Sequence, residues 1–459
     1  MATFSKITEQ GIASSLNGSD YVVVVAGGTL KRITLDNLRV MMEENQQQFL
    51  DENAFYIEEN TASPRGSRYV ETGGNELVRQ TWLSKITGIL ISPDGSYCRL
   101  NPNDSRYTID GDQVVLNGAV VDAYKNADWM GMLDGGYWNY LQEVIIGGVK
   151  HIRHHIALVP LPGGWYTPNV PVGMYKCSVV SGQLRSIPFV VPRSDENISA
   201  FFSYAQARGK NFGLAGEPFR NLMLQYIMAK YKDRDVQNIQ TSDGTKVFGL
   251  GLDGTEKKSA TATTDNFARQ KAIQTGACLA LGCNDGNVAV LDKDGGTCHS
   301  VNVGVWENPY GQYWEMDGHL CSVGTDVYQW DSNFLPQVTH PTAAHFANVA
   351  HTKLQRAKVS NDYTFAFDIS LITTSGAQRA SYVPRQPNFN ISYGDFFAYT
   401  ASGQLWQCGG CSSDLGSICG LASAVSNTFW LLSSSRCSAR LDFHGAISEV
   451  TSAQLKTLL

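Results

Sequence analysis

The chain has 459 residues, enough for roughly two to four folded units, with 43% hydrophobic and 17% charged residues. Together with 44 glycines and 10% aromatic residues, this composition is typical of turn-rich globular domains and excludes a disordered chain or a coiled-coil rod. The net charge of -6 offers no basic face to a phosphate backbone, so we expect no nucleic-acid partner.

We expect neither an export signal nor a membrane span. Residues 1–30 lack the basic start and long apolar stretch of a secretion signal, so we expect synthesis in a reducing cytosol and mostly free thiols among the 10 cysteines. No window approaches the roughly eighteen apolar residues of a membrane span, so we expect no membrane insertion.

The first predicted elements are a short hairpin and a helix. Tyr21–Val25 is rich in β-branched residues, Gly27-Gly28 favours a turn, and Leu30–Ile33 predicts the returning strand. Asp36 could cap the helix that follows. In this helix the a and d positions of a coiled coil are matched by Leu35, Leu38, Met42, Asn45 and Phe49. The pattern indicates either a self-associating segment or an amphipathic helix that packs on its own domain.

Residues 20–38, with the sequence DYVVVVAGGTLKRITLDNL, resemble the N-terminal virion-attachment segment of phage fibre and tail appendage proteins. In those proteins a short strand–turn–strand unit precedes an oligomerising helix. The resemblance implies that residues 1–60 attach the chain to other virion proteins and help it to associate with itself, in an expected homotrimer.

Between Glu76 and Pro192 short apolar runs alternate with turn signals, which predicts a β-sandwich or β-prism without a helix of useful length. The turn signals are Pro93-Asp94-Gly95, Asp110-Gly111-Asp112, Leu116-Asn117-Gly118, Asp134-Gly135-Gly136 and Pro162-Gly163-Gly164. We place a β-rich spacer domain at residues 61–185.

Three histidines stand close together in this region. In a strand His151 and His155 would share one face, and His154 would take the other. A solvated strand is the favoured interpretation, and coordination of an ion around a trimer axis is the alternative.

Two helices are predicted after the spacer. Asp195 is the expected cap of the first, whose apolar face comprises Ile198, Phe201, Phe202 and Ala205. Glu217-Pro218 opens the second. Its helical spacing is set by Phe219, Leu222, Met223, Tyr226, Ile227 and Lys230.

The sequence around position 310 is distinctive. Residues 304–318 read GVWENPYGQYWEMDG and resemble the G-x-E-N-x-x-G-x-x-W-E-x-x-D-G core of C-type-lectin-like domains, found in formylglycine-generating-enzyme relatives and in target proteins of phage diversity-generating retroelements. Trp306 and Trp314 can anchor a small core, while Asn308 and Gly311 suit a tight turn. The structural motif residues are Trp306, Glu307, Asn308, Gly311, Trp314 and Arg440.

Two further stretches follow the same family in the right order. Residues 219–240 look like its second helix and the following loop. Residues 435–441, SRCSARL, resemble its closing G-x-R-L strand, with Ser438 or Ala439 in place of the usual glycine. The resemblance covers residues 185–450, so we place a C-type-lectin-like domain at 186–459.

In retroelement targets the variable residues lie just before the closing strand, so the resemblance implies a recognition face between Trp406 and Arg436. This window is rich in small polar and aromatic residues, as recognition surfaces are. The candidate ligand-binding residues are Trp406, Gln407, Cys408, Cys411, Ser412, Ser413, Asp414, Ser426, Asn427, Phe429 and Trp430. The alternative is that residues 429–432 form a buried strand, which is favoured for Leu431 and Leu432.

Several residue patterns partly match known chemical sites. Cys408 and Cys411 have the spacing of half a zinc site, but Cys419 and Cys437 do not complete it. In the oxidase branch of the lectin-like fold two cysteines bind copper, and Cys411 and Cys419 are the nearest candidates here. The arginine-rich surroundings typical of that branch are absent from this sequence. Residues 249–254 match a dinucleotide pattern without the required helix, and Asp292 starts a calcium-like loop that lacks the glutamate. We therefore expect no enzyme, no metal and no cofactor.

The sequence as a whole predicts a β-rich α+β protein of the virion, synthesised in the host cytoplasm. The resemblances imply an adhesin or receptor-binding protein that contacts a host surface protein or glycan through its C-terminal lectin-like face. A structural capsid or tail decoration protein without receptor binding is the main alternative, and a lectin-fold oxidase is the third.

Overall fold

The computed structural model describes most of the chain up to residue 323 and a series of strands beyond it. The described residues are 21–26, 29–60, 70–233, 236–237, 239–249, 251–253, 270–323, 326–330, 346–348, 367–374, 377–384, 397–399, 405–408, 424–428 and 437–459. Antiparallel sheets dominate and helices are few in this part of the chain, which confirms the predicted β-rich α+β class.

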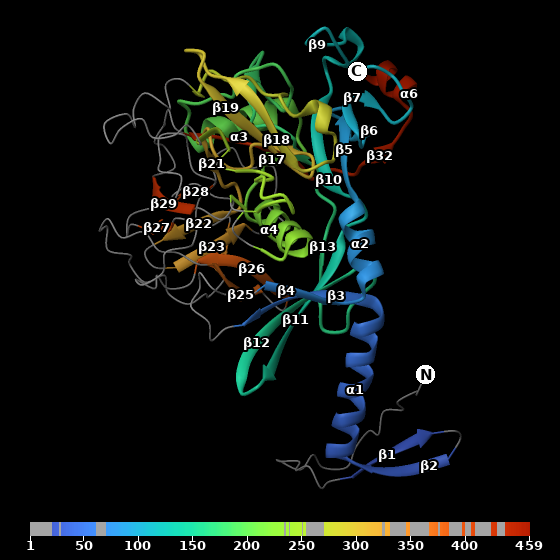
Figure 1. Cartoon of the computed structure of the whole chain (residues 1–459). Helices are drawn as coiled ribbons and strands as arrows, with labels where there is room; N and C mark the ends of the chain where they lie inside the picture. Colours follow the sequence, from blue (N-terminus) through green and yellow to red (C-terminus); the bar gives the residue numbers. More distant parts are fainter. Residues whose placement is uncertain are drawn as a thin grey trace.

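The N-terminal hairpin and helix form as predicted. β1 (Tyr21–Ala26) pairs antiparallel with β2 (Thr29–Thr34), and α1 (Leu35–Asn53) follows directly. The prediction of Asp36 as the N-cap of this helix is wrong. An N-cap residue precedes the helix, whereas α1 starts at Leu35 and Asp36 lies within its first turn. Figure 1 shows α1 extending away from the body of the molecule, with the hairpin at its far end.

The largest sheet contains strands from both sides of the boundary predicted between residues 185 and 186. Its order is β17-β31-β14-β10-β5-β6-β32, and β7 also pairs with β6. The strands are β5 (Ile86–Ile91), β6 (Ser96–Asn101), β7 (Asp104–Thr108), β10 (Asp128–Leu133), β14 (Val172–Gly173), β17 (Phe212–Leu214), β31 (Leu441–Phe443) and β32 (Ser448–Glu449). The predicted spacer and lectin-like segments therefore share one hydrogen-bonded sheet.

Both faces of this sheet are buried at its central strands, β5 and β10. Along β5, Leu90 belongs to one apolar cluster, while Ile89 and Ile91 belong to another. Because successive side chains of a strand point to opposite faces, the two clusters lie on opposite sides of the sheet. α4 (Glu217–Tyr231) contributes to the first cluster and α3 (Ile198–Arg208) to the second.

The two predicted helices bury the predicted faces, but the cap of α3 differs. All apolar positions named above for α3 and α4 are buried. Asn197 caps α3, and its side-chain oxygen accepts a hydrogen bond from the Ala200 amide at 2.8 Å. The prediction of Asp195 as cap is wrong, because this residue turns the chain before the helix with a φ of 65°. α4 begins at Glu217 with Pro218 in its first turn, as predicted.

The prediction of no helix of useful length between Glu76 and Pro192 is wrong at the start of this region. α2 (Glu76–Ser84) is capped by Asn75, whose side-chain oxygen accepts the Leu77 and Val78 amides. Only Trp82 of this helix is buried, so the sequence carries too little apolar periodicity to reveal it. The other regular helices of the described residues are α6 (Ser452–Leu458) and the 3-10 turns η2 (Asp122–Tyr124), η3 (Gly251–Asp253) and η4 (Leu279–Leu281).

A second sheet, of order β13-β11-β12-β3-β4, joins the end of α1 to the predicted spacer. Its strands are β3 (Ala54–Asn60), β4 (Val70–Gly74), β11 (Tyr137–Ile146), β12 (Val149–Ala157) and β13 (Trp165–Thr167). β3 continues directly from α1, so the helix is anchored to the body through backbone hydrogen bonds to β12.

The prediction of a solvated histidine strand in β12 is wrong, because all three imidazoles are buried and have protein partners. His154 Nε2 lies 2.9 Å from Asn139 Oδ1, and His151 Nδ1 lies 2.8 Å from Glu58 Oε1. Burial lowers the pKa of His154 and of His155 to about 3. Both are therefore neutral at pH 7.

Smaller sheets complete the described part. The strands are β8 (Val115–Leu116), β9 (Ala119–Val120), β15 (Ser178–Val180), β16 (Gln183–Arg185), β18 (Gly286–Leu291), β19 (Thr297–Val303), β20 (Trp306–Glu307), β21 (Trp314–Met316), β22 (Leu320–Val323), β23 (Asp326–Trp330), β24 (Phe346–Asn348), β25 (Phe367–Thr374), β26 (Ala377–Pro384), β27 (Phe397–Tyr399), β28 (Leu405–Cys408), β29 (Ala424–Thr428) and β30 (Cys437–Ser438). Asp292 forms the turn between β18 and β19, where its side chain accepts the Asp294 and Gly296 amides.

Two further expectations concern thiols and membranes. Free thiols are confirmed at six of the described cysteines: Cys98, Cys177, Cys278, Cys283, Cys298 and Cys437. Among the described residues, no helix combines the length and the apolar character needed to cross a bilayer.

Candidate functional site

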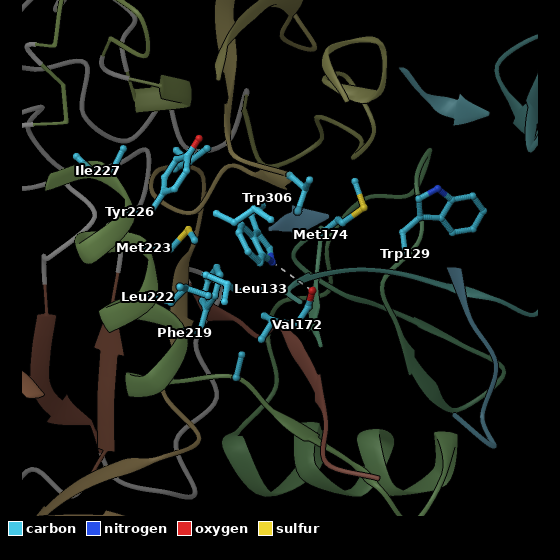
Figure 2. Close-up of a cluster of buried hydrophobic side chains, with 14 of the residues drawn as sticks. Trp129, Leu133, Val172, Met174, Phe219, Leu222, Met223, Tyr226, Ile227 and Trp306 are labelled. Carbon is cyan, nitrogen blue, oxygen red and sulfur yellow. Dashed lines mark hydrogen bonds between the residues drawn. The ribbon is translucent and has the colours of Figure 1, made fainter. Parts of the chain in front are cut away.

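The motif at residues 304–318 runs through β20, a tight turn and β21, and its first tryptophan lies in the main core. Trp306 is fully buried, and its indole nitrogen donates a hydrogen bond to the Val172 carbonyl at 3.2 Å (Figure 2). Its ring centroid lies 5.4 Å from that of Phe219 in α4. Gly131 in β10 makes room for the indole, since a Cβ there would lie 2.7 Å from Trp306 Cε2. This tryptophan therefore packs in the main apolar core.

The turn between β20 and β21 uses the two residues predicted for it. Asn308 has a φ of 48° and Gly311 a φ of 80°, values in the left-handed region that asparagine and glycine tolerate best. The Asn308 side chain accepts the Val301 amide at 2.9 Å and donates to Ser300 Oγ at 2.7 Å. These bonds to β19 fix the irregular backbone of the turn.

The Glu307 side chain contacts a different part of the chain from the turn residues. Its carboxylate oxygens accept the backbone amides of Gly276 and Cys278 at 2.9 and 2.8 Å. Burial raises the pKa of Glu307 to about 7, although the two amides favour the charged form. The side chain therefore ties β20 to the loop before η4.

The second glutamate of the motif, Glu315 in β21, lies between two buried cations. Arg440 Nη2 lies 2.7 Å from Glu315 Oε1, and Lys176 Nζ lies 3.2 Å from the same oxygen. Burial alone would favour the neutral acid, but Arg440 and Lys176 hold the pKa of Glu315 below its usual value. The carboxylate is therefore charged and links the motif to residues far away in the sequence.

Arg440 also connects three backbone segments. Its side chain is fully buried and donates to the carbonyls of Gly173, Met174 and Glu307 at 2.9, 2.8 and 3.0 Å. Lys176 in turn donates to the carbonyls of Asn308 and Gly311 in the motif turn. No local sequence signal marks Lys176, which lies more than a hundred residues before its partners.

The strand β21 carries the two ends of the predicted recognition window on its opposite edges. β28 pairs antiparallel with one edge, placing Cys408 beside Glu315 and Gln407 beside Met316 in the backbone register. β30 pairs parallel with the other edge, placing Cys437 beside Trp314. The described strands before and after residues 409–436 therefore pair with opposite edges of β21.

The structure gathers only part of the predicted ligand-binding set. Trp406, Gln407 and Cys408 lie in β28, and Ser426 and Asn427 lie in the adjacent β29. The backbone register between these strands shifts between Leu405 and Gln407. The candidates Cys411, Ser412, Ser413, Asp414, Phe429 and Trp430 lie outside the described residues, as do Leu431 and Leu432 of the alternative buried strand.

Only two of the four cysteines that could bind a metal lie among the described residues. Cys408 and Cys437 lie in strands on opposite edges of β21, and burial accompanies the free thiol of Cys437. Cys411 and Cys419 lie outside the described residues. No family model matches the chain, and no curated protein matches it.

Proposed function

We propose that this chain is a phage virion adhesin that attaches to the host cell surface through the segment between Trp406 and Arg436. The observation that carries the proposal is the fastening of this segment to β21, since β28 at its start and β30 at its end pair with opposite edges of that strand. In this proposal the segment belongs to a C-type-lectin-like domain, whose motif and closing arginine meet at Glu315.

A segment whose two ends are held by strand pairing suits recognition, because less conformational entropy is lost on binding. Binding through a loop costs conformational entropy when the loop becomes ordered, and a rigid support reduces that cost. Here β21 is held by Glu315 between Arg440 and Lys176, so the ends of the segment are fixed while residues 409–436 can vary in sequence. Binding residues are commonly carried in this way by loops on a rigid scaffold.

The N-terminal elements support the virion part of the proposal. The hairpin of β1 and β2 lies at the far end of α1, away from the strands that carry the proposed recognition segment (Figure 1). Attachment to other virion proteins at the hairpin, with α1 at the axis of a homotrimer, would leave those strands directed away from the virion. A protein or glycan of the host surface is the proposed partner.

The proposal is tested by binding of the fluorescently labelled full-length protein to cells of the bacterium that the phage infects. Flow cytometry would compare wild type with Trp406→Ala and Asn427→Ala, and with Lys125→Ala as a matched surface control whose side chain is 65% exposed. We expect wild type and Lys125→Ala to bind equally. A protein that combines Trp406→Ala with Asn427→Ala should lose most of the binding. Protein that binds purified virions but not cells would overturn the adhesin function and favour a decoration protein.

A further inference from the structure

Three side chains outside the motif converge where β21 and β31 end. Asp442 is the middle residue of β31, His444 follows this strand, and His319 stands three residues after β21. His319 Nε2 and His444 Nε2 each lie 2.9 Å from the same oxygen, Asp442 Oδ2. One potential ligand atom from each residue lies within 4.8 Å of the other two. Asp442 and His319 are buried, while the His444 side chain remains 16% exposed.

Hydrogen bonding leaves part of this cluster unsatisfied. Asp442 Oδ1 is buried and accepts no hydrogen bond, and its residue is only 1% exposed. His444 Nε2 lies within ion-pair distance of Oδ2, at 2.9 Å. A buried carboxylate oxygen without a donor is costly unless another group compensates it. An ion placed among the three residues would supply that compensation.

The geometry points to a binding site for one divalent transition-metal ion of the zinc class, held by His319, Asp442 and His444. Two imidazoles and one carboxylate form a ligand set that such ions favour. Zinc binds these atoms at about 2.0–2.2 Å, so ligand atoms in a tetrahedral site stand about 3.4 Å apart. Accommodating an ion would therefore move each imidazole about half an ångström from Asp442 Oδ2, with a fourth position left for water on the exposed His444 side.

The protein around the cluster favours a fixed site. Asp442 lies in a strand paired on both sides, with Val172 in β14 and Gly213 in β17. The His319 amide donates to Asp317 Oδ1 at 2.8 Å, and the His444 amide donates to the Asn211 carbonyl at 2.9 Å. Ligand backbones held in this way preorganise a metal site. A bound ion would fasten the chain after β21 to the central sheet.

The site can be tested on the full-length protein after removal of metals with EDTA. Isothermal titration with ZnCl2 is expected to give one site per chain in wild type, and at least a tenfold weaker site in His444→Ala and in Asp442→Asn. His299→Ala is the matched control, because His299 is exposed in β19 and lies outside the cluster. Binding in His444→Ala equal to that of wild type would overturn the inference.

A spectrum of the wild-type protein tests the inference without relying on the folding of a variant. Replacement of zinc by Co2+ is expected to give visible d–d bands without the near-ultraviolet charge-transfer band of a cobalt–thiolate bond. A strong thiolate band would assign the ion to cysteines and contradict the proposed ligands. No visible band after addition of one equivalent of Co2+ would likewise overturn the site.

Discussion

Arg440→Met removes the buried cation that joins the motif to the central sheet, and it is expected to lower the free energy of unfolding by about 4 kcal/mol. Removing one partner of a buried ion pair costs about 3–5 kcal/mol, because the other charge is left without compensation. Lys176 remains beside Glu315 and reduces this cost. The carbonyls of Gly173 and Met174 each lose the Arg440 donor and add to the cost, although the Met174 carbonyl still accepts the Glu307 amide. Methionine fills most of the volume, so the loss reports on charge and hydrogen bonds more than on a cavity.

The assay is urea unfolding followed by tryptophan fluorescence, with Arg106→Met as the matched control. Arg106 also forms a short ion pair with an aspartate, Asp104, at 2.6 Å, but its side chain is 48% exposed. Exposed pairs contribute roughly 0–1 kcal/mol, so the control should shift the unfolding midpoint only slightly. In the background of Arg440→Met, the further change Glu315→Gln should lower the stability again, because it leaves the buried Lys176 ammonium without its carboxylate.

Two outcomes would refute this reasoning. A shift of the urea midpoint in Arg440→Met no larger than in Arg106→Met would mean that the buried network does not hold the motif in place. A double variant, Arg440→Met with Glu315→Gln, that is as stable as Arg440→Met alone would mean that Glu315 does not compensate the buried Lys176.

Gly131→Ala should destabilise the fold by about 1–3 kcal/mol in the same assay, because its Cβ would overlap the Trp306 ring in a packed core. Acidification should destabilise the protein through His154 and His155, whose pKa of about 3 in the folded state lies below the usual value. Since the unfolded chain binds more protons between these values, stability falls as the pH drops from 7 to 5.5, by about 1 kcal/mol per histidine. Glu307, with a pKa raised to about 7, acts in the opposite sense, so the readout is the difference in pH dependence between wild type and His154→Gln/His155→Gln.

Gly286→Ala places its Cβ at an ordinary 3.5 Å from a leucine side chain and should be tolerated. Equal destabilisation by Gly131→Ala and Gly286→Ala would disprove the close approach to the indole. A histidine variant that loses as much stability on acidification as wild type would show that these imidazoles are not the groups that resist protonation.

Local signals in the sequence were sufficient to predict the elements whose conformation depends on neighbouring residues. The turn of the motif is an example, since Asn308 and Gly311 have the positive φ values that their residue types favour. The apolar spacing of α4 predicted its buried face for the same reason. The error at α3 was also local, because Asn197 and Asp195 are both good caps and only the backbone conformation decides between them.

Contacts across the chain could not be predicted from one sequence. Lys176 reaches the motif turn from more than a hundred residues away, and His319 meets Asp442 across a similar separation. No spacing rule links such residues. The histidines of β12 appeared polar in the sequence, yet β3 and β11 cover them, because burial of a strand depends on the sheet around it.

The central claim is that the segment fastened to β21 is the part that touches the host. Hydroxyl-radical footprinting of the full-length protein, free and bound to host cell envelopes, tests it most directly. Protection on binding is expected to concentrate in peptides from residues 406–436, while exposed positions such as Lys125 react equally in both states. Protection confined to other peptides, with residues 406–436 unchanged, would contradict the account.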